Sequence, residues 1–299
     1  MVDTIVVGIE GTEPSRVALR WSIERAATTG AEVVLVHVVD DEWASVSARI
    51  REGMAADAGR LLEREAEYAR SLAAGVTVGT RLLHGDVMDE LIAASRTASV
   101  IAVGTHKTGF IHGKVFGSRS LVLAAAAHSP VAIIPQPSQR GARGVVVGVD
   151  ASDAGRTAVR FAASEAARLH QTVTFVRASD APGQADEHAE VQRRRDEYLA
   201  ENAKALLSEA MVIARSVATG ADIRLRHIRR PAAEALLDAA ASAALLVVGS
   251  SRREPEADSA LGSVSHDVLI NLTVPTIVVH GSGQPAHSEL RGLAAGISV

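Results

Sequence analysis

The sequence repeats itself at a spacing of 140 to 145 residues, and this repeat constrains the fold more than any other feature. The strand-like segment Ile5-Val6-Val7-Gly8-Ile9-Glu10 returns as Val145-Val146-Val147-Gly148-Val149-Asp150. Further matches are Val103-Gly104 with Val248-Gly249, Gly117-Ser118 with Gly262-Ser263, and Ser129-Pro130-Val131 with Val274-Pro275-Thr276. Because these matches occur in the same order, we expect two domains with one chain path, over residues 1–137 and 144–281. A polar segment rich in Pro and Gly, residues 135–144, is typical of a linker.

Each copy alternates short β-branched runs with longer helical stretches. This pattern predicts βαβ units and, in each copy, a doubly wound parallel sheet with helices on both faces. In the first copy we expect strands near 3–9, 31–38, 77–83, 99–104 and 131–135. In the second we expect them near 144–149, 172–177, 222–228, 244–249 and 275–280. Helices are expected over 14–29 and 44–73, with Asp86 and Ser118 as N-caps of two more. The last strand of each copy is an apolar edge, so we expect the copies to pack through these strands as a pseudo-dimer.

The composition is that of an ordinary globular protein with an aliphatic interior. Of the 299 residues, 47% are hydrophobic but only 3% are aromatic, which suits parallel strands covered by helices. The net charge of −4, without a basic segment, argues against binding to nucleic acid. No run has the length of a membrane span, and no cysteine is present. We therefore expect a cytoplasmic protein that does not associate with membranes.

A ligand is expected where the first and fourth strands of a copy end. Ligands of open parallel sheets bind at the carboxyl ends of strands, where connections leave toward opposite faces. In the first copy this places Glu10-Gly11-Thr12 beside the loop that begins at Gly104 and reaches Ser118. Glycines and a helix start form a cradle for anions such as phosphates. The alternative is that these glycines only make a tight turn and that Ser118 is a routine cap; the repeat favours neither interpretation.

The motifs at these positions resemble those of universal stress proteins, and the resemblance covers nearly the whole chain. They are the Gly-x-acid ending of the first strand, His37-Val38 at the end of the second, and Gly-x2-Gly-x9-Gly-Ser/Thr after the fourth. The resemblance implies a five-stranded sheet of order 3-2-1-4-5 in each copy and self-association through the last strand. It also implies binding of adenine nucleotide, with ATP and Mg²⁺ as expected cofactors, and a regulatory role in the stress response toward a protein partner that the sequence does not identify.

By position, the resemblance assigns three groups of binding residues. Glu10 and Asp150 match the acid near base and ribose, followed by Gly11 and Thr12 in one copy and Ser152 in the other. Val38 and Ala178 match the residue whose backbone contacts adenine. The phosphate loops comprise Gly104, Lys107, Gly117 and Ser118 in the first copy and Gly249, Arg252, Gly262 and Ser263 in the second. Lys107 and Arg252 replace the middle glycine of the motif, and the second strand of the second copy ends in Arg177-Ala178.

Two other functions remain open at this point. The altered loops are compatible with an interaction module of the same fold that binds no nucleotide, and a slow ATPase is a third possibility. No general base stands in an evident position for attack by water, so we expect no catalytic residues. We also expect no metal site in the protein itself, because His106 and His112 lack a third ligand nearby. The two nucleotide sites should be unequal, since Lys107 and Lys114 favour a polyanion, whereas acidic residues outnumber the arginines in the second loop.

Overall fold

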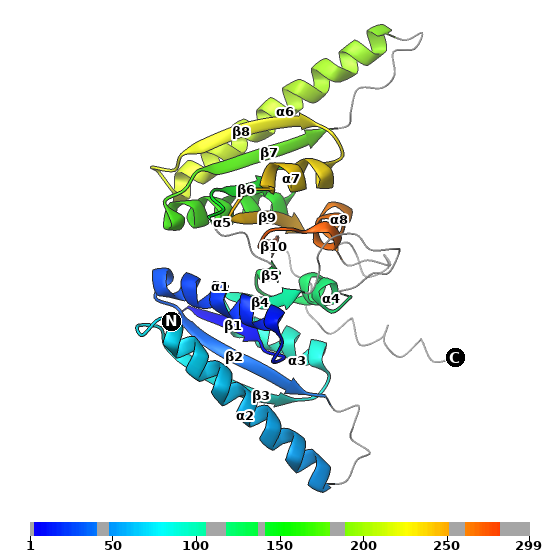
Figure 1. Ribbon diagram of the computed structural model, residues 1–299. Coiled ribbons are helices and arrows are strands. Elements are labelled where there is room, and N and C mark those ends of the chain that lie inside the picture. The colour runs from blue at the N-terminus through cyan, green and yellow to red at the C-terminus, as the bar shows by residue number, and fades with distance from the viewer. Residues whose placement is uncertain are drawn as a thin grey trace, which may run out of the picture.

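The computed structural model is an α/β protein in which one ten-stranded sheet runs through both halves of the chain (Figure 1). It describes residues 3–40, 48–105, 118–136, 141–179, 189–250 and 261–281. The strand order is β3-β2-β1-β4-β5-β10-β9-β6-β7-β8, so each half contributes five strands in the order 3-2-1-4-5. Within each half all neighbouring strands are parallel. The α/β class expected from the repeat is confirmed.

The elements of the N-terminal half follow the alternation that the sequence predicts. They are β1 (Thr4–Gly8), α1 (Glu13–Thr29), β2 (Glu32–Val39), α2 (Ala48–Leu72), β3 (Val78–His84), α3 (Val87–Ala94), a 3₁₀ turn η2 (Ser95–Thr97), β4 (Val100–Thr105), α4 (Ser118–Ala126) and β5 (Val131–Pro135). Thr12 caps α1 in a capping box with Ser15, and Asp86 caps α3 by accepting hydrogen bonds from two backbone amides. Gly30 ends α1 in a left-handed conformation, as glycine commonly does at this position.

The C-terminal half repeats this order. Its elements are β6 (Val145–Gly148), α5 (Asp153–Leu169), β7 (Val173–Ser179), α6 (Ala189–Val217), β8 (Ile223–Arg229), α7 (Ala232–Ala240), β9 (Leu245–Ser250), α8 (Ser263–Asn271) and β10 (Thr276–His280). Ser152 caps α5 as Thr12 caps α1. Both halves therefore contain the same crossover units, and each strand of one half is close in length to its counterpart in the other.

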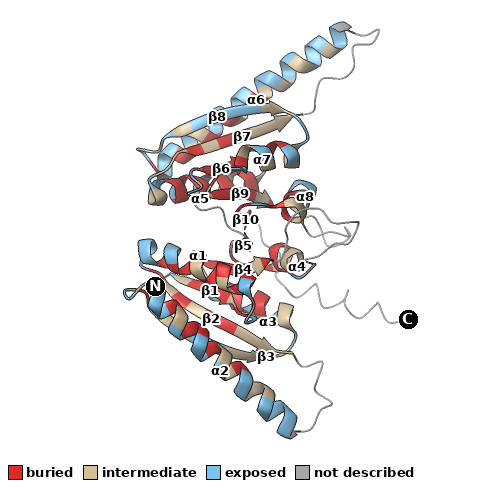
Figure 2. Ribbon diagram, viewed as in Figure 1, coloured by how far each residue is buried: buried red, intermediate tan, exposed pale blue. Residues whose placement is uncertain are grey.

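Helices cover both faces of the sheet, and each face holds one layer of the core. On one face, residues of α1, α2, α5 and α6 pack with alternate strand residues into a cluster that spans both halves. On the other face, residues of α3, α4, α7 and α8 form the second cluster. Figure 2 shows that the strands in the middle of the sheet are buried, whereas the outward faces of α2 and α6 are exposed. The two edges of the sheet are β3 and β8, which are the most exposed strands.

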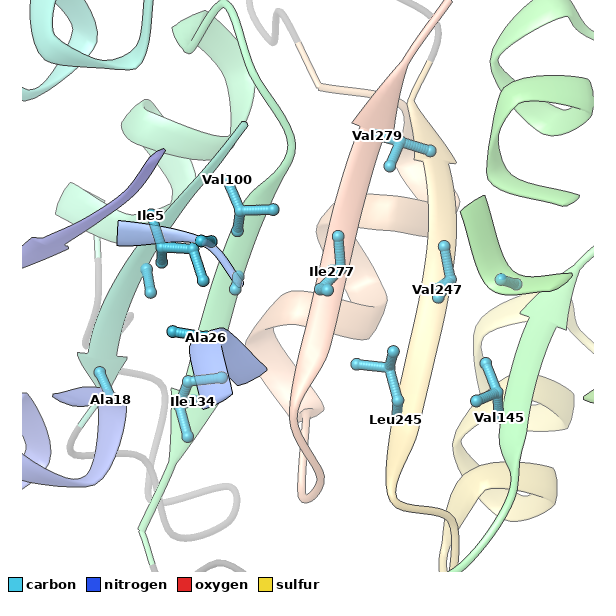
Figure 3. Packing of buried hydrophobic residues seen from close by; sticks show 14 of the residues in the cluster. Ile5, Ala18, Ala26, Val100, Ile134, Val145, Leu245, Val247, Ile277 and Val279 are labelled. Carbon is cyan, nitrogen blue, oxygen red and sulfur yellow. The ribbon is translucent and has the colours of Figure 1, made fainter. Parts of the chain in front are cut away.

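The two halves meet where β5 and β10 pair antiparallel. Ala132 stands opposite Ile277, and Val131 opposite Val278, in a continuous ladder. All the residues of β5 and the first four of β10 are buried, so neither strand is left as an open edge. Figure 3 shows Ile134 and Ile277 on these neighbouring strands, among the side chains of one core cluster.

Charged groups of α1 and α5 connect the two halves beside this junction. Glu165 of α5 is buried and forms ion pairs with Arg25 of α1 and, at 2.8 Å, with Arg168. Arg168 also donates a hydrogen bond of 2.5 Å to Thr28 Oγ1 of the first half. The Arg25 guanidinium lies over the rings of Trp21 and Phe161. The Glu165 carboxylate thus links the two halves beside the paired strands β5 and β10.

Candidate functional site

A cavity of about 620 Å³ opens at the carboxyl ends of β1, β2 and β4 in the N-terminal half. The chain leaves β1 toward α1 on one face of the sheet and leaves β4 toward α4 on the other. The cavity therefore lies at a topological switch point, where open parallel sheets place their ligands. Its volume falls within the range of about 300 to 1,000 Å³ that is usual for pockets of small molecules and cofactors.

Four of the predicted site residues of this half line the cavity: Glu10, Thr12, Val38 and Gly104. Gly11 lies between two of them without lining it. The φ of Gly11 is +76°, and a Cβ there would lie 3.0 Å from Leu61 Cδ1, so this glycine makes the turn into α1. Lys107 and Gly117 lie outside the described residues. Ser118 is the first residue of α4, and the structure does not describe its side chain.

The floor of the cavity is held by a hydrogen bond between two strand ends. His37 Nδ1 of β2 donates to the carbonyl oxygen of Ile9, at 2.6 Å. The apolar walls come from Val36, Val103, Leu91 and Met88. Glu10 is exposed, and it forms no hydrogen bond or ion pair among the described residues, so its carboxylate is available to a ligand.

Gly104 has a packing role that the motif does not indicate. A Cβ on Gly104 would lie only 2.0 Å from the carbonyl oxygen of Pro14 and 2.2 Å from its carbonyl carbon. The first turn of α1 therefore rests directly on the backbone of β4. Gly249 of the second half is in the same situation, with Ala154 backbone atoms 2.6 Å from the Cβ position. Both glycines are thus required by the close approach of a helix, whether or not a ligand contacts them.

Besides His37 of the motif, five polar residues of the cavity are absent from the sequence-predicted set: Ser15, Asp40, Thr105, Arg119 and Ser120. Ser15 lies in the first turn of α1, Thr105 ends β4, Asp40 directly follows β2, and Arg119 and Ser120 lie in the first turn of α4. The sequence signal for Arg119 is its place directly after Gly117-Ser118, in the first turn of a helix whose N-terminus favours negative charge. A prediction based on backbone amides alone does not include Arg119.

The corresponding cavity of the C-terminal half has a volume of only about 120 Å³. Among the predicted residues, Asp150, Ala178 and Gly249 line it, whereas Ser152, Gly262 and Ser263 do not. Gly262 is the N-cap of α8, its amide donates to Ser250 Oγ at 3.3 Å, and Ser263 begins the helix. Arg252 lies outside the described residues.

Different side chains pack against the first strand of each half. Leu236 Cδ1 lies 3.2 Å from the Cβ position of Gly148, whereas at Gly8 the nearest side-chain atom is Val103 Cγ1, also at 3.2 Å, and Leu91, the counterpart of Leu236, lies 3.9 Å away. Arg177 stands where the first half has His37, and it donates to the carbonyl oxygen of Val149 at 3.3 Å.

The acid of the second half also points differently. Asp150 Oδ1 accepts hydrogen bonds from the amide of Ser152 at 2.9 Å and from its hydroxyl at 2.6 Å. The carboxylate is therefore engaged in its own loop, in contrast to Glu10. Cations lie near the ends of the neighbouring strands: burial lowers the pKa of His227, and Arg229 and Arg177 lower it further, which favours the neutral ring.

The match to known proteins extends over both halves. A model of the universal stress protein family matches residues 1–135 and 142–280. A universal stress protein of Mycolicibacterium smegmatis is 28% identical over 92% of this chain and 96% of its own length. A universal stress protein of Mycobacterium tuberculosis is 29% identical over 93% of this chain and 96% of its own.

Solved structures give the same comparison at the level of the fold. The crystal structure of a universal stress protein from Archaeoglobus fulgidus aligns with a TM-score of 0.68 at 17% identity, covering 93% of this chain and 96% of that one. One from Pseudomonas aeruginosa aligns with a TM-score of 0.66 at 16% identity, covering 94% of each chain. Within the described residues, no helix is long and apolar enough to cross a membrane.

Proposed function

Because the chain belongs to the universal stress protein family, we propose that it is a regulatory protein that binds one adenine nucleotide, in the cavity of its N-terminal half. The observation that supports this is the cavity of about 620 Å³ at the switch point of the first half, which is lined by residues of three strand ends and three helix starts. The identity of the ligand as an adenine nucleotide comes from the family resemblance.

The chemistry of the lining suits such a ligand from end to end. Val36, Val38 and Met88 provide an apolar surface for a flat base. Glu10 offers carboxylate oxygens that can accept hydrogen bonds from ribose hydroxyls. The start of α4 lies across the cavity, and a helix N-terminus favours negative charge, so the phosphates are expected on that side.

The small cavity of the second half supports a stoichiometry of one. A volume of about 120 Å³ is well below the usual range of ligand pockets, and Asp150 is already hydrogen-bonded within its loop. The second half then serves as a structural partner that completes the sheet through β10. No observation on the described residues that line the larger cavity specifically favours a slow ATPase.

Isothermal titration calorimetry with ATP, in the presence of Mg²⁺ and separately with EDTA, tests this proposal. We expect one site per chain and a clear preference for ATP over GTP. Leu91→Trp would fill the N-terminal cavity and should abolish the binding, whereas Leu236→Trp, its counterpart in the second half, should leave it intact. Circular dichroism of both variants provides the control for folding. Two equal sites per chain, or binding lost only in the Leu236 variant, would contradict the proposal.

A further inference from the structure

Arg119 stands out because it is the one lysine or arginine among the described residues that line the larger cavity. It lies in the first turn of α4, is exposed, and borders the cavity. Its side chain forms neither an ion pair nor a hydrogen bond among the residues that the structure describes. Surface arginines elsewhere in the chain, such as Arg20 and Arg230, are paired with carboxylates. The Arg119 guanidinium is therefore available to an anion in the cavity.

The second half supplies a natural comparison. Its helix α8 begins at Ser263, as α4 begins at Ser118, and Val264 takes the position of Arg119. Val264 also lines the cavity of its half. The duplicated motif therefore does not require a cation at this position, and α8 forms with valine in place of arginine. The helix start itself gives no reason for Arg119.

The charges of the larger cavity are arranged with opposite signs on different elements. Glu10 follows β1 and Asp40 follows β2, whereas Arg119 belongs to α4. A guanidinium donates two parallel hydrogen bonds to a phosphate, while carboxylates repel phosphate and accept hydrogen bonds from hydroxyls. A nucleotide, which is neutral at one end and anionic at the other, fits this arrangement in one direction only.

We propose that Arg119 binds the phosphate group of the nucleotide and sets the selectivity of the N-terminal cavity for phosphorylated over unphosphorylated nucleosides. This inference rests on the proposed function and adds the residue that selects the ligand by charge. It assigns the second half no such selectivity, because Val264 offers no hydrogen bond.

The test compares the affinities for ATP, AMP and adenosine in three variants. Arg119→Val copies the second half into the first and should weaken ATP and AMP about tenfold to a hundredfold, the usual effect of losing a hydrogen bond to a charged group. Its affinity for adenosine should change less than about twofold. Arg119→Lys keeps the charge without the paired donors and should lie between. Val264→Arg is the matched control and should leave all three affinities unchanged.

Salt provides a second readout. The wild-type affinity for ATP should fall more steeply with ionic strength than that of Arg119→Val, because screening weakens only the interaction between charges. Equal losses for ATP and adenosine in Arg119→Val would overturn the inference, since they would indicate a structural role. A wild-type protein that binds ATP and adenosine equally well would also overturn it while leaving the proposed function intact. A wild-type protein that binds no adenine compound would reject both.

Discussion

Replacing Gly104 with alanine tests whether this glycine serves the ligand or the fold. A Cβ at this position would lie 2.0 Å from the Pro14 carbonyl oxygen, about 1.4 Å short of ordinary van der Waals contact near 3.4 Å. The obstructing atoms belong to the backbone, so rotation of a side chain cannot relieve the clash. The first turn of α1 would have to move away from β4, and we expect a loss of about 3 kcal/mol or more in the free energy of unfolding.

The magnitude should follow the geometry at other glycines. At Gly249 the nearest backbone atoms lie 2.6 Å from the Cβ position, so Gly249→Ala should cost less, about 1 to 2 kcal/mol. Gly59, inside α2, has no atom within 4 Å of its Cβ position. Gly59→Ala should therefore stabilise the protein by about 0.5 to 1 kcal/mol, the gain in helix propensity. The three variants thus have a predicted order.

Guanidinium chloride unfolding, followed by circular dichroism without nucleotide, measures this order. The comparison requires that the slope against denaturant stays constant among the variants. A Gly104→Ala protein that is as stable as the wild type but binds ATP weakly would refute the reasoning. It would mean that the glycine is needed for the approach of phosphate, as the motif alone suggests. A loss of stability without ligand supports the packing role.

Two ion pairs give further predictions. Arg16 lowers the pKa of the buried Glu65 carboxyl, chiefly through hydrogen bonds of 2.8 and 2.9 Å. The pair therefore stabilises the fold fully above the ordinary glutamate pKa of about 4.3, and this stabilisation is lost as the pH falls through the lowered pKa of Glu65 in the folded protein. Glu65→Gln should therefore flatten the acid limb of stability, measured by thermal melts from pH 6 to pH 2; an unchanged limb would contradict this. Glu165→Ala leaves Arg25 without its carboxylate at the junction and should cost about 3 kcal/mol in denaturant unfolding, whereas Glu190→Ala, on the exposed start of α6, should cost less than about 1 kcal/mol.

The fold was predictable because its determinants are local and occur twice. β-branched runs, helix caps such as Asp86, and the apolar last strands can all be recognised within a few residues. The contacts that define the site are not local. Gly104 contacts Pro14, which lies ninety positions earlier in the chain, and Glu65 of α2 contacts Arg16 of α1. Such contacts depend on how closely the elements pack, which no short motif specifies.

Comparison of equivalent positions in the two halves distinguishes residues that the fold requires from residues that line the cavity. Where packing requires a residue, the halves agree, since Gly104 and Gly249 are each contacted by the first turn of a helix. Arg16 and Arg156 each pair with a glutamate of the following helix, but Glu65 is buried whereas Glu209 is exposed.

Where side chains face the cavity, the halves differ. His37 corresponds to Arg177, and Arg119 corresponds to Val264. Both copies still fold into the same five-stranded arrangement, so these exchanges cost the scaffold little. Two cavities with the same ligand would be expected to keep the same lining as strictly as they keep the glycines. The divergence supports the proposal that only the N-terminal half binds a ligand, whereas the other half contributes β10 and Glu165 to the shared junction.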